Sequence, residues 1–153
     1  MKSIVIYYSE TGNTEKIAKA IAVSLGADLK RIEEIKTDDV SNYDLICLGT
    51  PVHSAAPAKI VRRFLKELPD LSSKKGAAFC TMHAFGDKRT FRIIKENFEA
   101  KGISFIDGFS CIGLSRLVAN FGPRIFNRGR PNEKDLKNAE AFGKKILGSI
   151  KNY

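Results

Sequence analysis

The sequence predicts an α/β domain with a doubly wound, five-stranded parallel sheet and helices on both faces. Three observations support this fold class. Strand-like and helix-like segments alternate with short connections, as they do in parallel sheets. Three of the strand-like runs are continuously apolar, which is typical of strands buried on both faces. The other two carry polar residues, as edge strands do, so the expected spatial order is 2-1-3-4-5.

The individual elements follow from apolar periodicity and from turn residues. The central strands are expected at 3–8, 44–49 and 75–82, and the edge strands at 29–35 and 103–112. Between them, apolar residues recur every three or four positions, which predicts four helices. The expected helix boundaries are 14–25 before Gly26, Pro57 to Pro69, 88–101 before Gly102, and a final helix that starts at a capping box of Asn132 and Asp135.

Composition is that of a globular chain, with 43% hydrophobic and 28% charged residues. We expect one domain over residues 1–153. No apolar run approaches the roughly 20 residues that span a bilayer, and the N-terminus lacks the apolar stretch of a signal peptide. We therefore expect a cytoplasmic protein without a membrane partner.

The three cysteines, Cys47, Cys80 and Cys111, lie far apart in apolar runs and form no CxxC motif. This pattern predicts buried, reduced thiols and no metal site. The chain is basic, with 26 Lys and Arg against 17 Asp and Glu. No basic stripe interleaved with aromatic residues is present, so we expect no nucleic acid. Solvation, or else an acidic protein partner, accounts for the charge.

In a doubly wound sheet, ligands bind beyond the carboxyl ends of the strands, where the winding reverses. The loops at that place are 9–14, 50–57 and 81–87. In the first loop, Gly12 permits a close backbone approach, and the following helix presents free N–H groups. The hydroxyls of Ser9, Thr11 and Thr14 add donors. Without a Walker lysine or GxGxxG, the loop favours a phosphomonoester. Alternatively, Thr14 merely caps the helix.

The first loop resembles the flavodoxin phosphate-binding signature, T/S-x-T-G-x-T directly after the first strand. The length, the element order and the final helix entered through RGRPNEKDLKNAEAF also resemble short-chain flavodoxins. The resemblance implies a flavodoxin-like fold, bound FMN and electron transfer through the isoalloxazine ring. The residues that it assigns to the FMN phosphate are Ser9, Glu10, Thr11, Gly12, Asn13 and Thr14.

The resemblance also gives roles to the second loop, which in this family passes the flavin N5 edge. Thr50, Pro51 and Val52 match its usual opening, and His53 falls where an aromatic ring often contacts the flavin. Alternatively, His53 is a solvent-exposed loop residue. Ser54 and Ala55 stand where many flavodoxins have a glycine whose peptide flips toward reduced N5. A positive φ costs these residues more than it costs glycine.

The third loop binds the pyrimidine end of the flavin in this family, through backbone groups and often a stacked ring. The residues implied here are Thr81, Met82, His83, Phe85, Gly86 and Asp87. Phe85 is the candidate ring, and Gly86 allows close approach. Alternatively, Phe85 packs into the core and Asp87 caps the next helix.

The connection 113–131 is long, which indicates a function. It carries Arg116, Arg124, Arg128 and Arg130 and no acid, with Leu117, Val118, Phe121, Ile125 and Phe126 as apolar anchors. It is interpreted as a docking surface for an acidic, ferredoxin-like redox protein, as a wall over the flavin, or as a packed loop with solvated arginines.

We therefore expect an FMN-binding electron carrier with a redox protein partner, rather than an enzyme with its own substrate. The alternative is an FMN-dependent oxidoreductase acting on a quinone, a porphyrinogen or another small molecule. A receiver domain would need clustered acids after the first strand, where Tyr8-Ser9-Glu10 offers one. A module that has lost the flavin, or a nucleic-acid binder, completes the set of alternatives.

Overall fold

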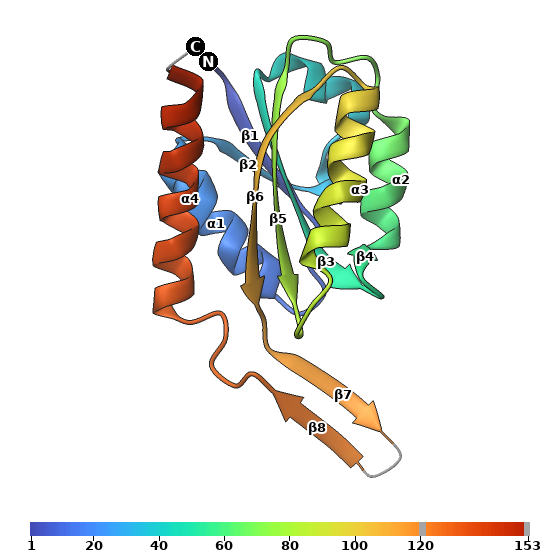
Figure 1. The fold of residues 1–153 in the computed structure, drawn as a ribbon, viewed down its shortest axis with the longest axis vertical. Coiled ribbons are helices and arrows are strands. Elements are labelled where there is room, and N and C mark those ends of the chain that lie inside the picture. The colour runs from blue at the N-terminus through green and yellow to red at the C-terminus, as the bar shows by residue number, and fades with distance from the viewer. Residues whose placement is uncertain (120–121, 152–153) are drawn as a thin grey trace.

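The computed structural model describes residues 1–119 and 122–151, and the side chains of 1–114 and 127–151. Five parallel strands and four helices alternate, and two further strands form a hairpin before the last helix (Figure 1). The strands are β1 (Ser3–Tyr7), β2 (Asp28–Arg31), β3 (Leu45–His53), β4 (Ala56–Pro57), β5 (Lys75–Met82), β6 (Ser104–Ile112), β7 (Ser115–Ala119) and β8 (Gly122–Phe126). The helices are α1 (Asn13–Leu25), α2 (Lys59–Glu67), α3 (Asp87–Ala100) and α4 (Glu133–Lys151).

The parallel sheet has the order β2-β1-β3-β5-β6, which confirms the expected order 2-1-3-4-5 for the five parallel strands. Helices α1 and α4 cover one face of the sheet, and α2 and α3 cover the other (Figure 1). The winding therefore reverses between β1 and β3, and the three expected loops follow β1, β3 and β5 at the carboxyl edge.

Two apolar clusters fill the space between the sheet and its helices. Successive side chains of a strand point to opposite faces. In β1, Ile4 and Ile6 therefore pack against α2 and α3, whereas Val5 and Tyr7 pack against α1 and α4. Cys47 contributes to the second cluster in the same way. The continuous apolar runs of the sequence thus reflect burial on both faces.

Two expected boundaries were wrong. The edge strand ends at Arg31 rather than at 35, because the Arg31 N–H donates to the Glu34 side chain at 3.0 Å and the chain turns into 3₁₀ segments. Pro57 does not open a helix. It pairs with Val52 in the short antiparallel strand β4, and α2 starts only at Lys59.

The long connection 113–131, in which the sequence predicted no strand, contains the antiparallel hairpin β7–β8. Ser115 pairs with Phe126 and Ala119 pairs with Gly122. The hairpin projects beyond the carboxyl ends of the parallel strands (Figure 1). The expected anchor Phe121 lies outside the described residues. The same holds for the side chains of Arg116, Leu117, Val118, Arg124, Ile125 and Phe126.

The capping box at the start of α4 is confirmed. Asn132 Oδ1 accepts from the Asp135 N–H at 3.0 Å, and Asp135 Oδ2 accepts from the Asn132 N–H at 2.7 Å. Arg130 Nη2 also donates to Asp135 Oδ1 at 2.7 Å. In the part of the chain that the structure describes, none of the helices is long and apolar enough to cross a membrane.

Candidate functional site

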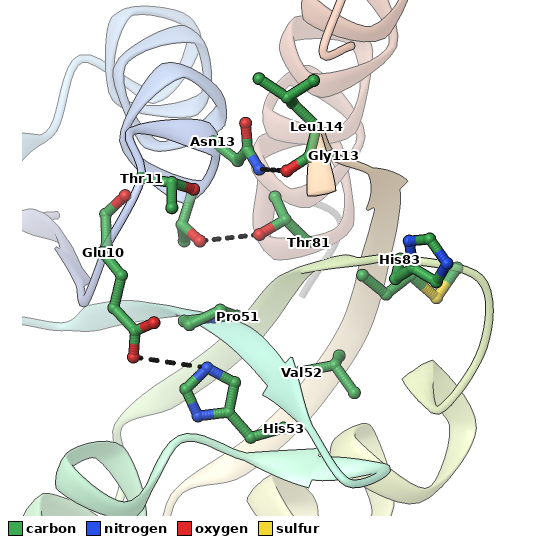
Figure 2. A pocket seen from close by; sticks show the side chains of 13 residues that line it. Glu10, Thr11, Asn13, Pro51, Val52, His53, Thr81, His83, Gly113 and Leu114 are labelled. Carbon is green, nitrogen blue, oxygen red and sulfur yellow. Dashed lines mark hydrogen bonds and ion pairs between the residues drawn. The ribbon is translucent and has the colours of Figure 1, made fainter. Parts of the chain in front are cut away.

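The three expected loops meet around a hollow of about 190 Å³ at the carboxyl edge of the sheet (Figure 2). The lining residues come from four segments of the chain: Ser9, Glu10, Thr11, Asn13 and Thr14; Pro51, Val52 and His53; Thr81, Met82 and His83; Gly113 and Leu114. Each of the first three segments follows or ends a central strand. The sequence therefore predicted which loops come together.

The first loop forms a cradle of backbone N–H groups at the start of α1. Gly12 caps this helix with φ = 90°, a conformation that glycine adopts without strain. Among the described residues, no side chain caps the helix. The alternative in which Thr14 is the cap is therefore wrong, because the helix already begins at Asn13. The N–H groups of the first turn remain directed toward the hollow.

Hydroxyl groups extend this cradle. Ser9 Oγ accepts from the Gly12 N–H at 3.1 Å, which leaves its own hydroxyl hydrogen available to a ligand. The hydroxyls of Thr14 and Thr81 lie 2.8 Å apart in a buried pair. Such a pair uses one of its two hydrogens and leaves the other to donate outward. The resemblance assigned Thr81 to the third loop, and the structure brings its hydroxyl against Thr14 of the first loop.

The first loop carries one acid, Glu10, whose side chain is turned away from the cradle toward His53 (Figure 2). Glu10 Oε1 accepts from the Tyr8 hydroxyl at 3.2 Å and lies 3.4 Å from His53 Nε2. Burial, and then the Glu10 charge, raise the pKa of the Tyr8 hydroxyl. The carboxylate is thus held by two partners on one side of the hollow, and its charge is kept apart from the anion cradle.

The positive charge of Arg31 lies next to the cradle. Arg31 Nη2 donates to the carbonyl of Ser9 at 3.2 Å, from the neighbouring strand β2. Sequence reasoning missed Arg31. The signal was the strand order, because pairing β2 beside β1 brings Arg31 opposite Tyr7, two residues before Ser9.

The wall formed by Gly113 and Leu114 was also missed in the site assignment. Asn13 Nδ2 donates to the Leu114 carbonyl at 2.7 Å. Asn127 Nδ2 donates to the carbonyls of His83 and Gly113 at 2.9 and 3.2 Å. The length of the connection 113–131 was the signal for this wall, since long connections often line sites.

The second and third loops pack tightly on each other. Ser54 and Ala55 have φ values of 50° and 58° and form the two-residue turn between β3 and β4. Gly86 caps α3 with φ = 109°, and a Cβ atom there would lie 2.8 Å from Ala55 Cα and from Val52 Cγ1. Ser54 and Ala55 therefore adopt a positive φ, although this conformation costs them more than it costs glycine.

Six predicted site residues do not line the hollow: Gly12, Thr50, Ser54, Phe85, Gly86 and Asp87. The Thr50 hydroxyl accepts from the Ala58 N–H at 3.0 Å and so anchors the start of α2. Phe85 is 78% exposed, so the alternative of core packing is wrong. Asp87 accepts from the Ser110 hydroxyl at 3.0 Å instead of capping α3. The three cysteines are buried and unpaired, as the sequence predicted.

The flavodoxin domain model matches residues 4–118 of the chain. The chain is 33% identical over 151 residues to an uncharacterized protein of Methanocaldococcus jannaschii, covering 96% of this chain and 99% of that protein. It is 28% identical to the flavodoxin of Clostridium beijerinckii over 152 residues, covering 93% and 96%. A solved flavodoxin from the domain Archaea has a TM-score of 0.78 at 22% identity, covering 99% of both chains. The chain belongs to the flavodoxin domain family.

Proposed function

We propose that this protein is an FMN-binding electron carrier. The observation that carries this proposal is the cradle at the start of α1, which combines the positive φ of Gly12, uncapped helix N–H groups and the hydroxyls of Ser9 and Thr14. These donors suit a phosphate dianion without a lysine in the loop. The flavin supplies the redox chemistry when it is bound, and the protein positions it.

The residues proposed to hold FMN are those of the three loops. Ser9, Thr11, Asn13 and Thr14 lie at the cradle, and the hydroxyl of Thr81 belongs to it. The isoalloxazine ring is assigned to the space between the second and third loops, beside His53 and exposed Phe85. The acid Glu10, paired with His53, closes one side.

Proteins of this family transfer electrons to redox partners. We include in the proposal that the partner here is an acidic, ferredoxin-like redox protein, because the chain carries a formal net charge of +9. A complex with such a partner needs an exposed route to the flavin, and the cofactor hollow opens at the surface beside His53 and Glu10.

An FMN titration followed by absorbance and fluorescence tests the proposal, with the Thr14→Val variant as the probe. Thr14→Val keeps the shape of the side chain but removes a buried donor, so FMN affinity should fall about tenfold or more. The control is Thr90→Val, the same substitution at a buried threonine whose Oγ1 has no partner among the described residues. It should leave FMN affinity unchanged.

Two results would contradict the proposal. Absence of FMN binding by the wild-type protein would favour a module that has lost the flavin. Rapid turnover of a quinone with a nicotinamide cofactor by the FMN-loaded protein would favour the oxidoreductase alternative, because a carrier should turn over slowly.

A further inference from the structure

The starts of α2 and α3 form a basic surface beside the cofactor hollow. The first six residues of these two helices contain one acid, Asp87, and six exposed cations, namely Lys59, Arg62, Arg63, Lys88, Arg89 and Arg92. We refer to these six cations as the basic α2/α3 edge. Both helices start at the carboxyl edge of the sheet and cover the same face of it (Figure 1). Their cations therefore lie on one side of the cofactor hollow.

Helix stability does not explain these charges. A helix N-terminus carries a partial positive charge, so a cation in the first turn destabilises the helix. Intramolecular ion pairs do not explain them either. Among the described residues, Arg63 alone of the six has an ion pair, with Glu67 at 2.8 Å. The cations are therefore available to an external partner.

The α2 part of the basic α2/α3 edge adjoins the cofactor hollow. Lys59 and Arg63 line a neighbouring hollow of about 410 Å³ together with Glu10 and His53, which also line the cofactor hollow. The lining of this second hollow also includes Ile60 and the half-buried Tyr8. A lining that mixes apolar side chains with cations has the composition of a protein-docking surface.

We propose that the basic α2/α3 edge docks an acidic redox protein, and this inference rests on the proposed function. Carboxylates around the redox centre of the partner would pair with the six cations and steer the encounter. With FMN bound, each encounter would transfer one electron from the reduced centre of the partner, which would be oxidised, to the flavin, which would be reduced. No covalent bond forms or breaks between the two proteins. The docking surface is thereby placed on α2 and α3 rather than on the connection 113–131.

The test uses the FMN-loaded full chain with Lys59→Glu and Lys88→Glu combined. The probe is a reduced acidic ferredoxin with two [4Fe–4S] clusters, and stopped-flow absorbance measures the second-order rate of flavin reduction. The rate should fall about tenfold at low ionic strength, and the difference should fade toward 1 M salt, where the Debye length is only about 3 Å. Glutamate suits a helix N-terminus, so unfolding does not account for a loss.

The matched control combines Lys144→Glu and Lys151→Glu, which changes the net charge equally on the opposite helical layer. Both lysines are exposed in α4 and have no ion pair among the described residues. The control should keep the wild-type rate within about twofold. Equal slowing in both double variants would show that net charge acts without a docking site, and would overturn the inference.

The remaining outcomes separate this inference from the proposed function. Unchanged rates in both double variants, with normal FMN titration, would reject the docking surface alone. Loss of binding to duplex DNA or to phosphatidylserine vesicles in Lys59→Glu/Lys88→Glu, with unchanged electron transfer, would assign the edge to those ligands. Failure of the wild-type protein to bind FMN would overturn the proposed function, and the inference with it.

Discussion

The two helical layers that cover the sheet differ in the charge at their helix N-termini, which is balanced in one layer and basic in the other. In the α1/α4 layer, the first six residues of the helices hold as many acids as cations, namely Glu15, Glu133 and Asp135 with Lys16, Lys134 and Lys137. In the α2/α3 layer, six cations stand against one acid. Acids stabilise a helix N-terminus and cations destabilise it. Helix stability therefore accounts for the acids of the first layer, whereas for the cations of the second layer we propose partner binding.

The largest effect that the comparison predicts is at Asp135, where charge serves folding. Asp135→Ala removes the acceptor for the Asn132 N–H and leaves Arg130 without its carboxylate. Urea unfolding should show a loss of about 2–4 kcal/mol in the free energy of unfolding. Glu133→Ala is the control, because this side chain is 83% exposed and its ion pair with Lys137 should contribute less than about 0.5 kcal/mol. If Asp135→Ala lowers the free energy of unfolding no more than Glu133→Ala does, the charge of Asp135 does not serve folding.

Cys111 is buried in the apolar cluster between the sheet and the α1/α4 layer, so we expect its thiol to be unreactive. Burial, and then the charge of Asp135, raise the pKa of the Cys111 thiol from 9.0 to about 11. At pH 8 an aromatic disulfide reagent should label it at least about a hundredfold more slowly in the native than in the unfolded protein, because the thiolate is the nucleophile. Since the folded state holds this proton more tightly, the free energy of unfolding should fall as pH rises from about 9, the ordinary value, toward the folded pKa of about 11. Rapid labelling of a native thiol at pH 8 would show that the layer is open.

The two layers also differ in backbone strain in the segments next to their helices α1 and α2. Helix α1 is flanked by Gly12 and Gly26 at positive φ, whereas the turn that leads to α2 places Ser54 and Ala55 there. Ala55→Gly should raise the free energy of unfolding by about 1 kcal/mol, since alanine is strained at positive φ. Ala56→Gly, one residue further along in β4, should lower it by about 0.5–1 kcal/mol. Thermal unfolding of both variants measures whether each is more or less stable than the wild type. Two changes of the same sign would argue against strain at the turn.

The smallest expected effect is on the stability of the basic α2/α3 edge itself. Lys59→Glu combined with Lys88→Glu should raise the free energy of unfolding by about 0.5–1 kcal/mol at low salt. The pair Lys144→Glu and Lys151→Glu should lower it slightly, because the acid at position 151 stands in the last turn of α4, where it opposes the helix dipole. Unfolding curves at low and high salt would show whether the two double variants change the free energy of unfolding in opposite directions. A destabilised Lys59→Glu/Lys88→Glu variant would mean that these lysines serve folding after all.

The parts of the fold that sequence predicted best are those buried on both faces. The run 75–82 coincides with β5 (Lys75–Met82), because a central strand leaves a continuous apolar signature. Prediction failed where the chain is not buried on both faces. Strand β2 ends early at Arg31, and no strand was predicted where the hairpin β7–β8 lies. Two short strands outside the main sheet leave too little alternation to separate a hairpin from a loop.

For the candidate site, the sequence predicted the three loops but not the contacts between them. Gly12 and its hydroxyl neighbours were recognisable because the cradle is built from six consecutive residues. The pair Thr14–Thr81 and the bond from Arg31 to Ser9 were not recognisable, since each joins segments from different strands. His53 was predicted to contact a ligand, but its partner Glu10 emerged only from the folded chain.

The sequence by itself determined the alternation of strands and helices, their spatial order and the glycine and hydroxyl groups of the loop before α1, because each depends on periodicity or on adjacent residues. Only the tertiary structure decided which charges and hydroxyls meet. The crossovers bring Asn13 to Leu114 and Thr14 to Thr81, and they place the starts of α2 and α3 on one side of the hollow. Such contacts depend on strand register and helix placement, which no local pattern encodes.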